Sequence, residues 1–357
     1  MKKWIGMLLI LTLVLAACDT GGTATEAATD AATDAVTEEI NETEDTSDST
    51  QNSAEVGEIT HLGYGTEVSL TGSKEGTEEA GPSAQASATL GAVAFDAEGR
   101  IVDVQIDVIQ PSIAYTTEGT FDSDQQAVIS SKRDLGDDYG MIAASGIGKE
   151  WYEQIDALQN WMVGKTVEEI TGLNRDEDTD LNSSVTISVD PYQRLVQEAW
   201  DNKVDAQGAT KVGIAIDASA QRSAELQNDV IQAQFDIPMA AVAVDDAGVV
   251  KASFIDNAQV RQQFAADGSF AAEPEADAKT KNELGADYNM IGASGIGKEW
   301  NEQAQAIADW AVGKDLAGIE GLSVTDGKTD DPDLSSSVTI TVTEYQAVLA
   351  EAIQNAE

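Results

Sequence analysis

The sequence predicts an α+β fold with two tandem homologous domains, each a small mainly antiparallel sheet packed with helices, after a disordered tether. Three observations support this: a long internal repeat, a β-rich hairpin followed by an amphipathic helix in each copy, and an acidic, aromatic-free segment before the first copy. The expected boundaries are 1–17 for a signal peptide, 18–57 for the tether, 58–205 for domain 1 and 206–357 for domain 2.

Composition limits the possible functions. Asp and Glu number 64 against 20 Lys and Arg, a formal net charge of −44. Such a surface repels nucleic acid, so we expect no nucleic-acid partner. One Cys and one His argue against an intrachain disulfide, a thiolate zinc site, an iron–sulfur cluster and His-ligated haem, and we expect no metal site. A redox function would therefore need an organic cofactor.

The first residues have the pattern of an export signal. Lys2 and Lys3 precede an apolar run over 5–14, which is too short to anchor the chain across a bilayer. The run ends in Leu-Ala-Ala-Cys18, which resembles the lipobox of bacterial lipoprotein signals. We therefore expect lipidation of Cys18 and a membrane contact through that lipid, because two acyl chains anchor a protein durably. The alternative is an ordinary secretory signal with an incidental Cys.

The segment 19–55 contains no aromatic residue, Lys or Arg. It has too little apolar surface to offset the entropy of ordering the chain, and its acidic residues repel one another. We expect a disordered tether, for which the role of a passive spacer is a sufficient explanation.

The rest of the chain is a duplication. The segment 135–151 (LGDDYGMIAASGIGKEW) returns as 284–300 (LGADYNMIGASGIGKEW), and the correspondence runs without a gap from Leu90 and Met239 to Gly172 and Gly321. Repeats of 20–50 residues indicate solenoids, so this much longer period indicates two whole domains. Each copy is long enough to bury a core of its own.

The elements of each copy follow from local patterns. A hairpin is expected over 90–95 and 101–108 around a turn at 96–99, and again over 239–244 and 249–255. A helix over 149–163 is expected to bury one stripe and to stop at Gly164, as its counterpart stops at Gly313. The stripe residues are Trp151, Ile155, Leu158 and Met162 in the first copy and Trp300, Ala304, Ile307 and Ala311 in the second.

A strand and a last helix complete each copy. The strands are expected at 185–189 and 338–342, with Thr186 on the polar face. Asp190 is the expected N-cap of the first last helix, with Pro191 in its first turn. Thr343 and Gln346 have the spacing of a capping box in the second copy. The expected buried residues of the first last helix are Tyr192, Leu195, Val196 and Ala199.

The loop and strand near the end of each copy carry a motif. Residues 180–186 read DLNSSVT and residues 333–339 read DLSSSVT. The pattern resembles the flavinylation motif of FMN-binding domains, Asp-x-x-Ser/Thr-Gly-Ala-Thr/Ser, whose last hydroxyl is esterified to FMN phosphate by a dedicated flavin transferase. The order of elements in each copy is also similar to that family. In place of Gly-Ala this chain has Ser184-Val185 and Ser337-Val338. The alternative is a plain edge strand with solvent-facing Thr.

The resemblance implies FMN bound covalently, two per chain. The implied acceptors are Thr186 and Thr339, and the other matching motif residues are Asp180, Ser183, Asp333 and Ser336.

The glycine-rich segment before the long helix is nearly identical in the two copies. Glycines at a helix start let backbone N–H groups approach an anion. A nucleotide-binding P-loop is rejected because Glu299 stands where its Ser or Thr is required. The segment could instead line a flavin or form a tight turn beside a core Trp. The candidates for cofactor binding are Met141, Ser145, Gly146 and Lys149, with Trp151, and Met290, Ser294, Gly295 and Lys298.

Together these features resemble surface flavin-bearing lipoproteins of the extracellular electron-transfer type. The resemblance implies an electron carrier, rather than an enzyme with its own turnover, on the outer face of the cytoplasmic membrane. It would pass electrons from a membrane NADH dehydrogenase and the quinone pool to external electron acceptors, with the flavin doing the redox chemistry. The alternative function is a cofactor-free surface lipoprotein that binds a ligand or adheres.

Overall fold

The computed structural model of the chain describes residues 56–357. The expected signal peptide, Cys18 and nearly all of the expected tether lie outside the described residues. Residues Asn52–Glu357 form one compact unit, with no division near residue 205.

Antiparallel sheets dominate both halves, which confirms the mixed α and β class. The first half contains β1 (His61–Ser69), β3 (Ser87–Phe95), β4 (Ile101–Ile109) and β6 (Val204–Asp205), in the order β4-β3-β1-β6. The second contains β7 (Lys211–Ile216), β9 (Val230–Val244) and β10 (Val250–Ala265), in the order β10-β9-β7, with β8 (Ala224–Gln227) paired to β9. Two small ribbons pair β2 (Ser83–Gln85) with β5 (Ser112–Ala114) and β11 (Val324–Thr325) with β12 (Lys328–Thr329).

Both predicted hairpins are confirmed. In the first turn Asp96 Oδ1 accepts hydrogen bonds from the N–H groups of Glu98 and Arg100, at 3.0 and 2.8 Å. Asp245 does the same in the second turn. The second hairpin is longer than the sequence pattern suggests, because β9 and β10 remain paired out to Val230 and Ala265.

Each half carries its own helices. The first has α1 (Lys132–Leu135), α2 (Trp151–Met162), α3 (Val167–Thr171), α4 (Thr179–Ser184) and α5 (Asp190–Asn202), with 3₁₀ turns at Gly136–Tyr139 and Arg175–Glu177. The second has α6 (Lys281–Leu284), α7 (Trp300–Ala311), α8 (Leu316–Glu320) and α9 (Thr343–Gln354), with a 3₁₀ turn at Gly285–Tyr288. The predicted apolar stripes of α2, α5 and α7 are buried, which confirms them.

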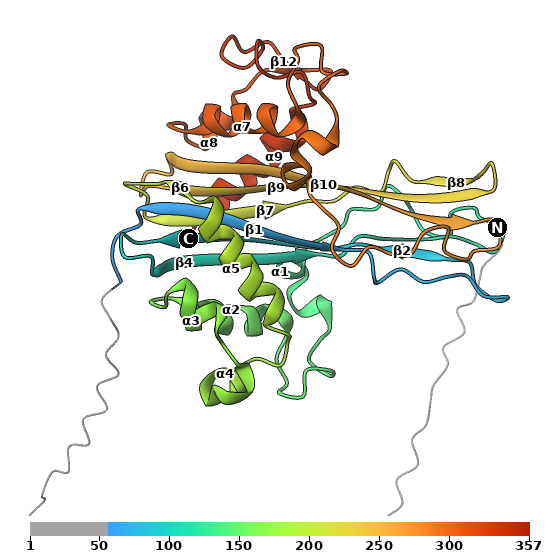
Figure 1. Cartoon of the computed structure of the whole chain (residues 1–357), viewed down its shortest axis with the longest axis horizontal. Coiled ribbons are helices and arrows are strands. Elements are labelled where there is room, and N and C mark those ends of the chain that lie inside the picture. The colour runs from blue at the N-terminus through green and yellow to red at the C-terminus, as the bar shows by residue number, and fades with distance from the viewer. Residues whose placement is uncertain (1–55) are drawn as a thin grey trace, which may run out of the picture. The chain divides into compact units, whose positions relative to one another are not determined.

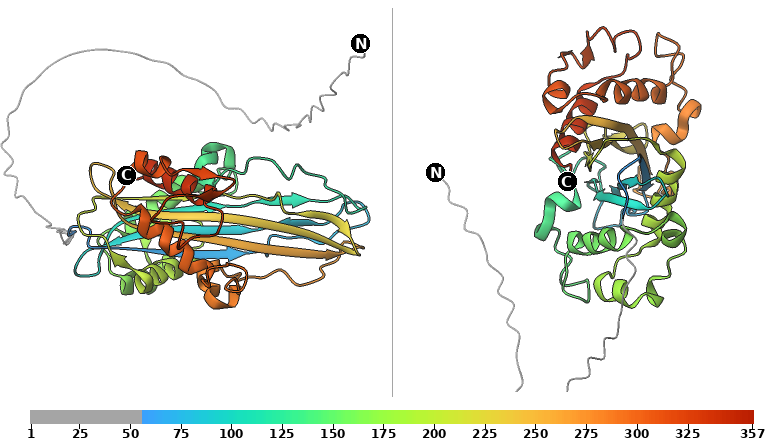
Figure 2. Two further views of the ribbon diagram at one scale, coloured as in Figure 1. Left: turned by 90° about the horizontal axis from the view of Figure 1, so that it is seen from above. Right: turned by 90° about the vertical axis from the view of Figure 1, so that its left-hand side faces the viewer.

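The unit is layered (Figures 1 and 2). The inner faces of the two sheets share one apolar core, to which Leu62 and Leu90 contribute from the first half and Phe235 and Ile237 from the second. The outer face of the first sheet packs against α2 and α5, and the outer face of the second against α7 and α9. Each half therefore buries one face of its sheet with its own helices and the other face against its twin.

The last helix of each half packs against a strand at backbone distance. A Cβ added to Gly63 on β1 would lie 1.8 Å from the carbonyl oxygen of Ala199 on α5, and one added to Gly213 on β7 would lie 2.0 Å from that of Ala352 on α9. Any larger residue would push the helix away. These glycines fix the helices that follow the two Thr-containing segments.

Three local predictions are wrong. Segments 185–189 and 338–342 are not strands, because no neighbouring strand pairs with them. Asp190 is the first residue of α5 and not its N-cap, which is Val189. Thr343 likewise opens α9 without capping it, and Gln346 Nε2 donates instead to the carbonyl groups of Ile319, Glu320 and Leu322. The glutamine side chain thus ties α9 to the end of α8.

Candidate functional site

Thr186 presents an exposed hydroxyl between two anchored neighbours. Val185 and Val189 are buried in the outer core, whereas Thr186 and Ser188 are exposed, so the expected alternation holds without a sheet. The threonine is held by Gln154 of α2, whose Oε1 accepts from Thr186 N at 2.7 Å and from Thr186 Oγ1 at 3.0 Å. A side-chain amide replaces the missing strand partner.

Thr339 has the same support and one bond more. Gln303 Oε1 accepts from Thr339 N at 2.7 Å and from its Oγ1 at 3.1 Å. The hydroxyl also lies 2.9 Å from the carbonyl oxygen of Ser294, to which it donates. Thr339 is half-buried, so its hydroxyl is less accessible than that of Thr186.

The same two glutamines connect the threonines to the glycine-rich segments. Gln154 Nε2 donates to Lys149 O at 3.2 Å, and Gln303 Nε2 donates to Lys298 O at 3.3 Å. Both glutamine side chains are fully buried. The two motifs that the sequence analysis singled out, 32 residues apart or more, therefore meet through one buried amide in each half.

The glycine-rich segment is a rigid turn. Ser145 is buried, and its hydroxyl donates to Ile142 O and accepts from Lys149 N. Buried Glu150 accepts the N–H groups of Met141 and Ile142, at 2.8 and 3.0 Å. Ser294 and Glu299 make the same bonds in the second half. Gly146 and Gly295 both have φ +72°, which favours glycine there, and both are exposed.

A cation lies against each threonine segment. Arg175 Nη1 donates to the carbonyl oxygens of Thr186 and Ile187, at 3.1 and 3.3 Å. Lys328, the same eleven residues before its threonine, donates through Nζ to Thr339 O. Arg175 and Thr186 also border a cavity of about 420 Å³ together with Ser188 and Asp190. Two retained cations in so acidic a chain mark a place suited to an anion such as a phosphate.

An aromatic cavity lies on the other side of Ser188. It measures about 260 Å³, near the lower limit of ligand pockets at roughly 300 Å³. Its walls include Lys132, Tyr139, Met141, Trp151 and Tyr192. Lys132 Nζ lies 4.8 Å from the ring centre of Tyr139 and 5.3 Å from that of Trp151. Burial raises the pKa of Tyr192 to about 12, so its hydroxyl stays neutral at physiological pH.

The second half repeats this lysine and its aromatic neighbours. Lys281 Nζ lies 5.1 Å from the ring centre of Tyr288 and 5.2 Å from that of Trp300. The ring centres of Trp300 and Tyr345 are 5.8 Å apart. Lys281 is only 6% exposed, and burial lowers the pKa of its ammonium to about 8, with Asp236 opposing the shift.

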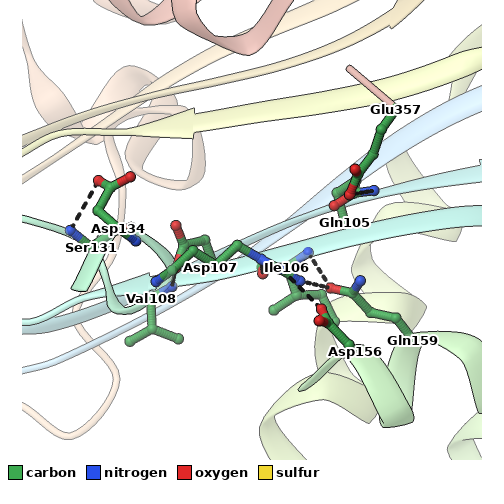
Figure 3. A network of polar contacts seen from close by, with 10 residues as sticks. Gln105, Ile106, Asp107, Val108, Ser131, Asp134, Asp156, Gln159 and Glu357 are labelled. Carbon is green, nitrogen blue, oxygen red and sulfur yellow. Dashed lines mark hydrogen bonds and ion pairs between the residues drawn. The ribbon is translucent and has the colours of Figure 1, made fainter. Parts of the chain in front are cut away.

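The position of Lys132 depends on a network that joins α1 to the first sheet (Figure 3). The next residue, Arg133, donates to Ile106 O and to Gln159 Oε1, each at 2.7 Å, and pairs with Asp156 at 3.0 Å. Asp107 accepts the N–H of Arg133 at 3.2 Å, and burial raises the pKa of that carboxyl. In the second half Asp256 accepts the N–H of Asn282 at 3.1 Å.

The remaining motif residues take part in local bonds. Ser183 Oγ donates to Asp180 O within α4, at 2.8 Å. In the second half the N–H of Asp333 donates to Asp331 Oδ1. Ser336 lies in a turn, and these four motif residues are exposed. They shape the loop before the threonine, and their bonds do not reach its hydroxyl.

The candidate lysine of the glycine-rich segment contacts the site through its backbone. Lys149 accepts from Gln154, as described above. The side chain of Lys298 lines a different cavity of about 580 Å³, with Tyr64, Asn202 and Asn282. The cations beside the aromatic rings are therefore Lys132 and Lys281.

Several residues at the site were not among the sequence candidates. They are Gln154 and Gln303, Arg175 and Lys328, Lys132 and Lys281, and Tyr139 and Tyr288. One signal was available for all of them: each pair keeps its chemistry at equivalent places in the two copies. For the glutamines a second signal was a polar residue within a buried helix stripe.

Two negative findings concern residues 56–357. No helix in that range is long and apolar enough to cross a membrane. In the same range no three His, Cys, Asp or Glu side chains gather in a way that could hold a metal ion.

Comparisons with known proteins give limited information. No family model matches the chain, and no solved structure matches it. A protein named chlorophenol reductase from Desulfitobacterium hafniense is 36% identical over 93 residues, which is 23% of this chain and 28% of that protein. The chain thus matches less than a third of the length of this curated relative.

Proposed function

We propose that this chain is an electron-carrying flavoprotein that holds one FMN on Thr186 and one on Thr339 through phosphate esters. It would be attached to the outer face of the cytoplasmic membrane by lipid on Cys18. Electrons would arrive from a membrane dehydrogenase and the quinone pool and leave to external acceptors. The finer prediction of two tandem FMN-binding domains belongs to the same proposal.

The observation that carries the proposal is the buried glutamine of each half. Gln154 and Gln303 hold the threonine N–H and hydroxyl with one oxygen and the glycine-rich turn with their nitrogen. A plain surface threonine has no need of such an arrangement, and the chain builds it twice. It leaves Thr186 Oγ1 fixed in direction and open to solvent, as an acceptor of phosphate must be.

The surrounding residues fit FMN. Arg175 and Lys328 would hold the phosphate at the threonine. Trp151, Tyr139 and Tyr192 offer aromatic walls for the flavin ring, next to the ammonium of Lys132. The cofactor, when bound, supplies the redox chemistry, and these residues attach it, shield it and place a positive charge beside it.

Attachment requires an activated flavin. An ester formed from free FMN would have to expel water in water, so the donor must be a flavin–nucleotide pyrophosphate handled by the transferase. The bond from threonine Oγ1 to the FMN phosphorus forms and the pyrophosphate bond breaks. The nucleoside monophosphate leaves with the hydroxyl proton, and no electron is transferred.

The test is intact mass of the chain co-expressed with a flavin transferase. We expect two added masses of FMN less water in the wild type, one in Thr186→Val or Thr339→Val, and none in the double variant. Thr66→Val, which changes a threonine on β1, is the control and should keep both. Flavin that survives in the double variant would move the attachment elsewhere. A bare polypeptide in every preparation would favour the cofactor-free ligand-binding or adhesive lipoprotein.

A further inference from the structure

The two halves differ at one position of the site wall. Val108 on β4 lines the aromatic cavity of the first half. Its counterpart on β10 is Asn257, because Val108 pairs with Thr89 across the first hairpin and Asn257 pairs with Pro238, the residue equivalent to Thr89, across the second. An apolar wall in one copy is therefore a carboxamide in the other.

Asn257 lies on the face of β10 that carries the helices. Side chains alternate along a strand, and Phe254 and Ala258 belong to the core shared between the sheets. Ile255 belongs instead to the outer core with Trp300 and Tyr345. Asn257 shares the face of Ile255, as Val108 shares the face of Ile106 with Trp151 and Tyr192.

The amide of Asn257 lacks a partner. The residue is 1% exposed, and among the described residues neither its Oδ1 nor its Nδ2 makes a hydrogen bond. Buried polar atoms without partners cost free energy and are rare in folded proteins. An unpaired donor and acceptor side by side point to a ligand that brings the complementary pair.

We propose, on the basis of the proposed function, that Asn257 binds the imide edge of the flavin in the second half and makes the two flavins unequal. A flavin presents C=O and N–H groups side by side on its pyrimidine ring. A carboxamide matches such an edge with two hydrogen bonds, in the way that Asn and Gln read nucleobases.

This contact has an electrical consequence. Reduction places negative charge on the pyrimidine ring, and the N–H of Asn257 and the buried ammonium of Lys281 would stabilise that charge. Val108 provides no such bond in the first half. The flavin on Thr339 should therefore be the easier to reduce, so that electrons pass from the first half to the second.

The test measures the midpoint potential of each flavin alone. Thr339→Val leaves the flavin on Thr186, and Thr186→Val leaves the flavin on Thr339. We expect the flavin on Thr339 to have a reduced-to-oxidised ratio at least tenfold higher at a given potential, which is about 30 mV for a two-electron couple. Equal potentials would overturn the inference, and this comparison needs no change at residue 257.

A substitution then assigns the difference to Asn257. Asn257→Val in the Thr186→Val chain copies the first half and should remove most of the potential difference. The same change should raise the melting temperature of the cofactor-free chain, because it removes the unpaired amide, but should raise it less in the loaded chain. An unchanged potential, or an equal gain in both forms, would contradict the role of Asn257.

The two proposals fail in different ways. Absence of FMN from Thr339 in the intact mass would refute the proposed function itself. FMN present on Thr339 with a potential insensitive to Asn257→Val would refute only the inference about the imide edge. Val108→Asn in the Thr339→Val chain is the reciprocal variant and should raise the potential of the first flavin.

Discussion

The two halves of this chain keep the same attachment point and differ in what surrounds it. Gln154 and Gln303 hold their threonines with nearly equal distances, and the turns closed by Glu150 and Glu299 are alike. The hydroxyl of Thr186 is exposed, whereas that of Thr339 is half-buried and also bonded to Ser294 O. The comparison indicates that holding a threonine is the constrained feature and that the walls were free to diverge.

The halves also differ from independent domains in how they are packed. We expected each copy to bury its own core, and the outer clusters fit that expectation. The central core, however, draws residues from both sheets. Such a core depends on contacts between distant parts of the chain, which local sequence patterns do not reveal.

The largest expected effect comes from separating the halves. A fragment of residues 56–205 exposes the inner face of its sheet, including Leu62 and Leu90, to water. Loss of this apolar burial should abolish cooperative unfolding of the fragment. Thermal denaturation followed by near-UV circular dichroism measures this. A fragment that melts like the whole unit would show that the halves fold independently.

The next effect is at the bridging glutamines. Gln154→Leu removes the acceptor of the Thr186 N–H and the donor to Lys149 O. We expect a loss of about 2–4 kcal/mol of stability, from buried polar groups left unpaired, and loss of flavin from Thr186 alone. Urea denaturation and intact mass measure the two results.

The second half supplies the internal control for this variant. Gln303→Leu should remove flavin from Thr339 and spare Thr186. Gln197→Leu, at an exposed position of α5, should change neither. Equal loss of both flavins in Gln154→Leu would mean that the substitution acts through global unfolding.

Stability should depend on pH at the junction of the halves. Glu198 accepts the N–H of Thr66 at 2.9 Å, and burial, with Glu283, Asp256 and Asp277 nearby, raises the pKa of its carboxyl to about 7. Because the folded state binds this proton more tightly than the unfolded state, stability falls as pH rises from about 4.5 to about 7.

The magnitude of that loss is about 1–2 kcal/mol after allowance for solvent screening of a half-buried group. Urea denaturation at pH 5 and at pH 8 measures it. Glu198→Gln should flatten the dependence. Asp256, whose pKa burial raises to about 6, should leave a residual slope in that variant. A stability that rises from pH 5 to pH 8 would contradict the assignment.

The smallest expected effect concerns the cations at the threonines. Arg175→Gln and Lys328→Gln should each slow flavin attachment to the neighbouring threonine several-fold, because a phosphate loses its positive partner. Arg175→Lys and Lys328→Arg should retain most of the rate. A time course of mass with the transferase measures it, and an unchanged rate would leave these residues a structural role only.

Sequence patterns predicted the hairpins and the buried stripes of α2, α5 and α7, because these depend on residues close together in the chain. They failed at 185–189, where alternating burial arises from packing on a helix and a glutamine supplies the bond expected from a strand. The pairing of Lys132 with Trp151 was also not foreseen, because it depends on how α1 is attached to β4.

The most direct test of the account is peptide mapping of the chain taken from its own host. The account predicts that the peptides containing Thr186 and Thr339 each carry one FMN, with the Thr186 peptide more completely modified because its hydroxyl is more exposed. Both peptides found unmodified in native material would contradict the central claim.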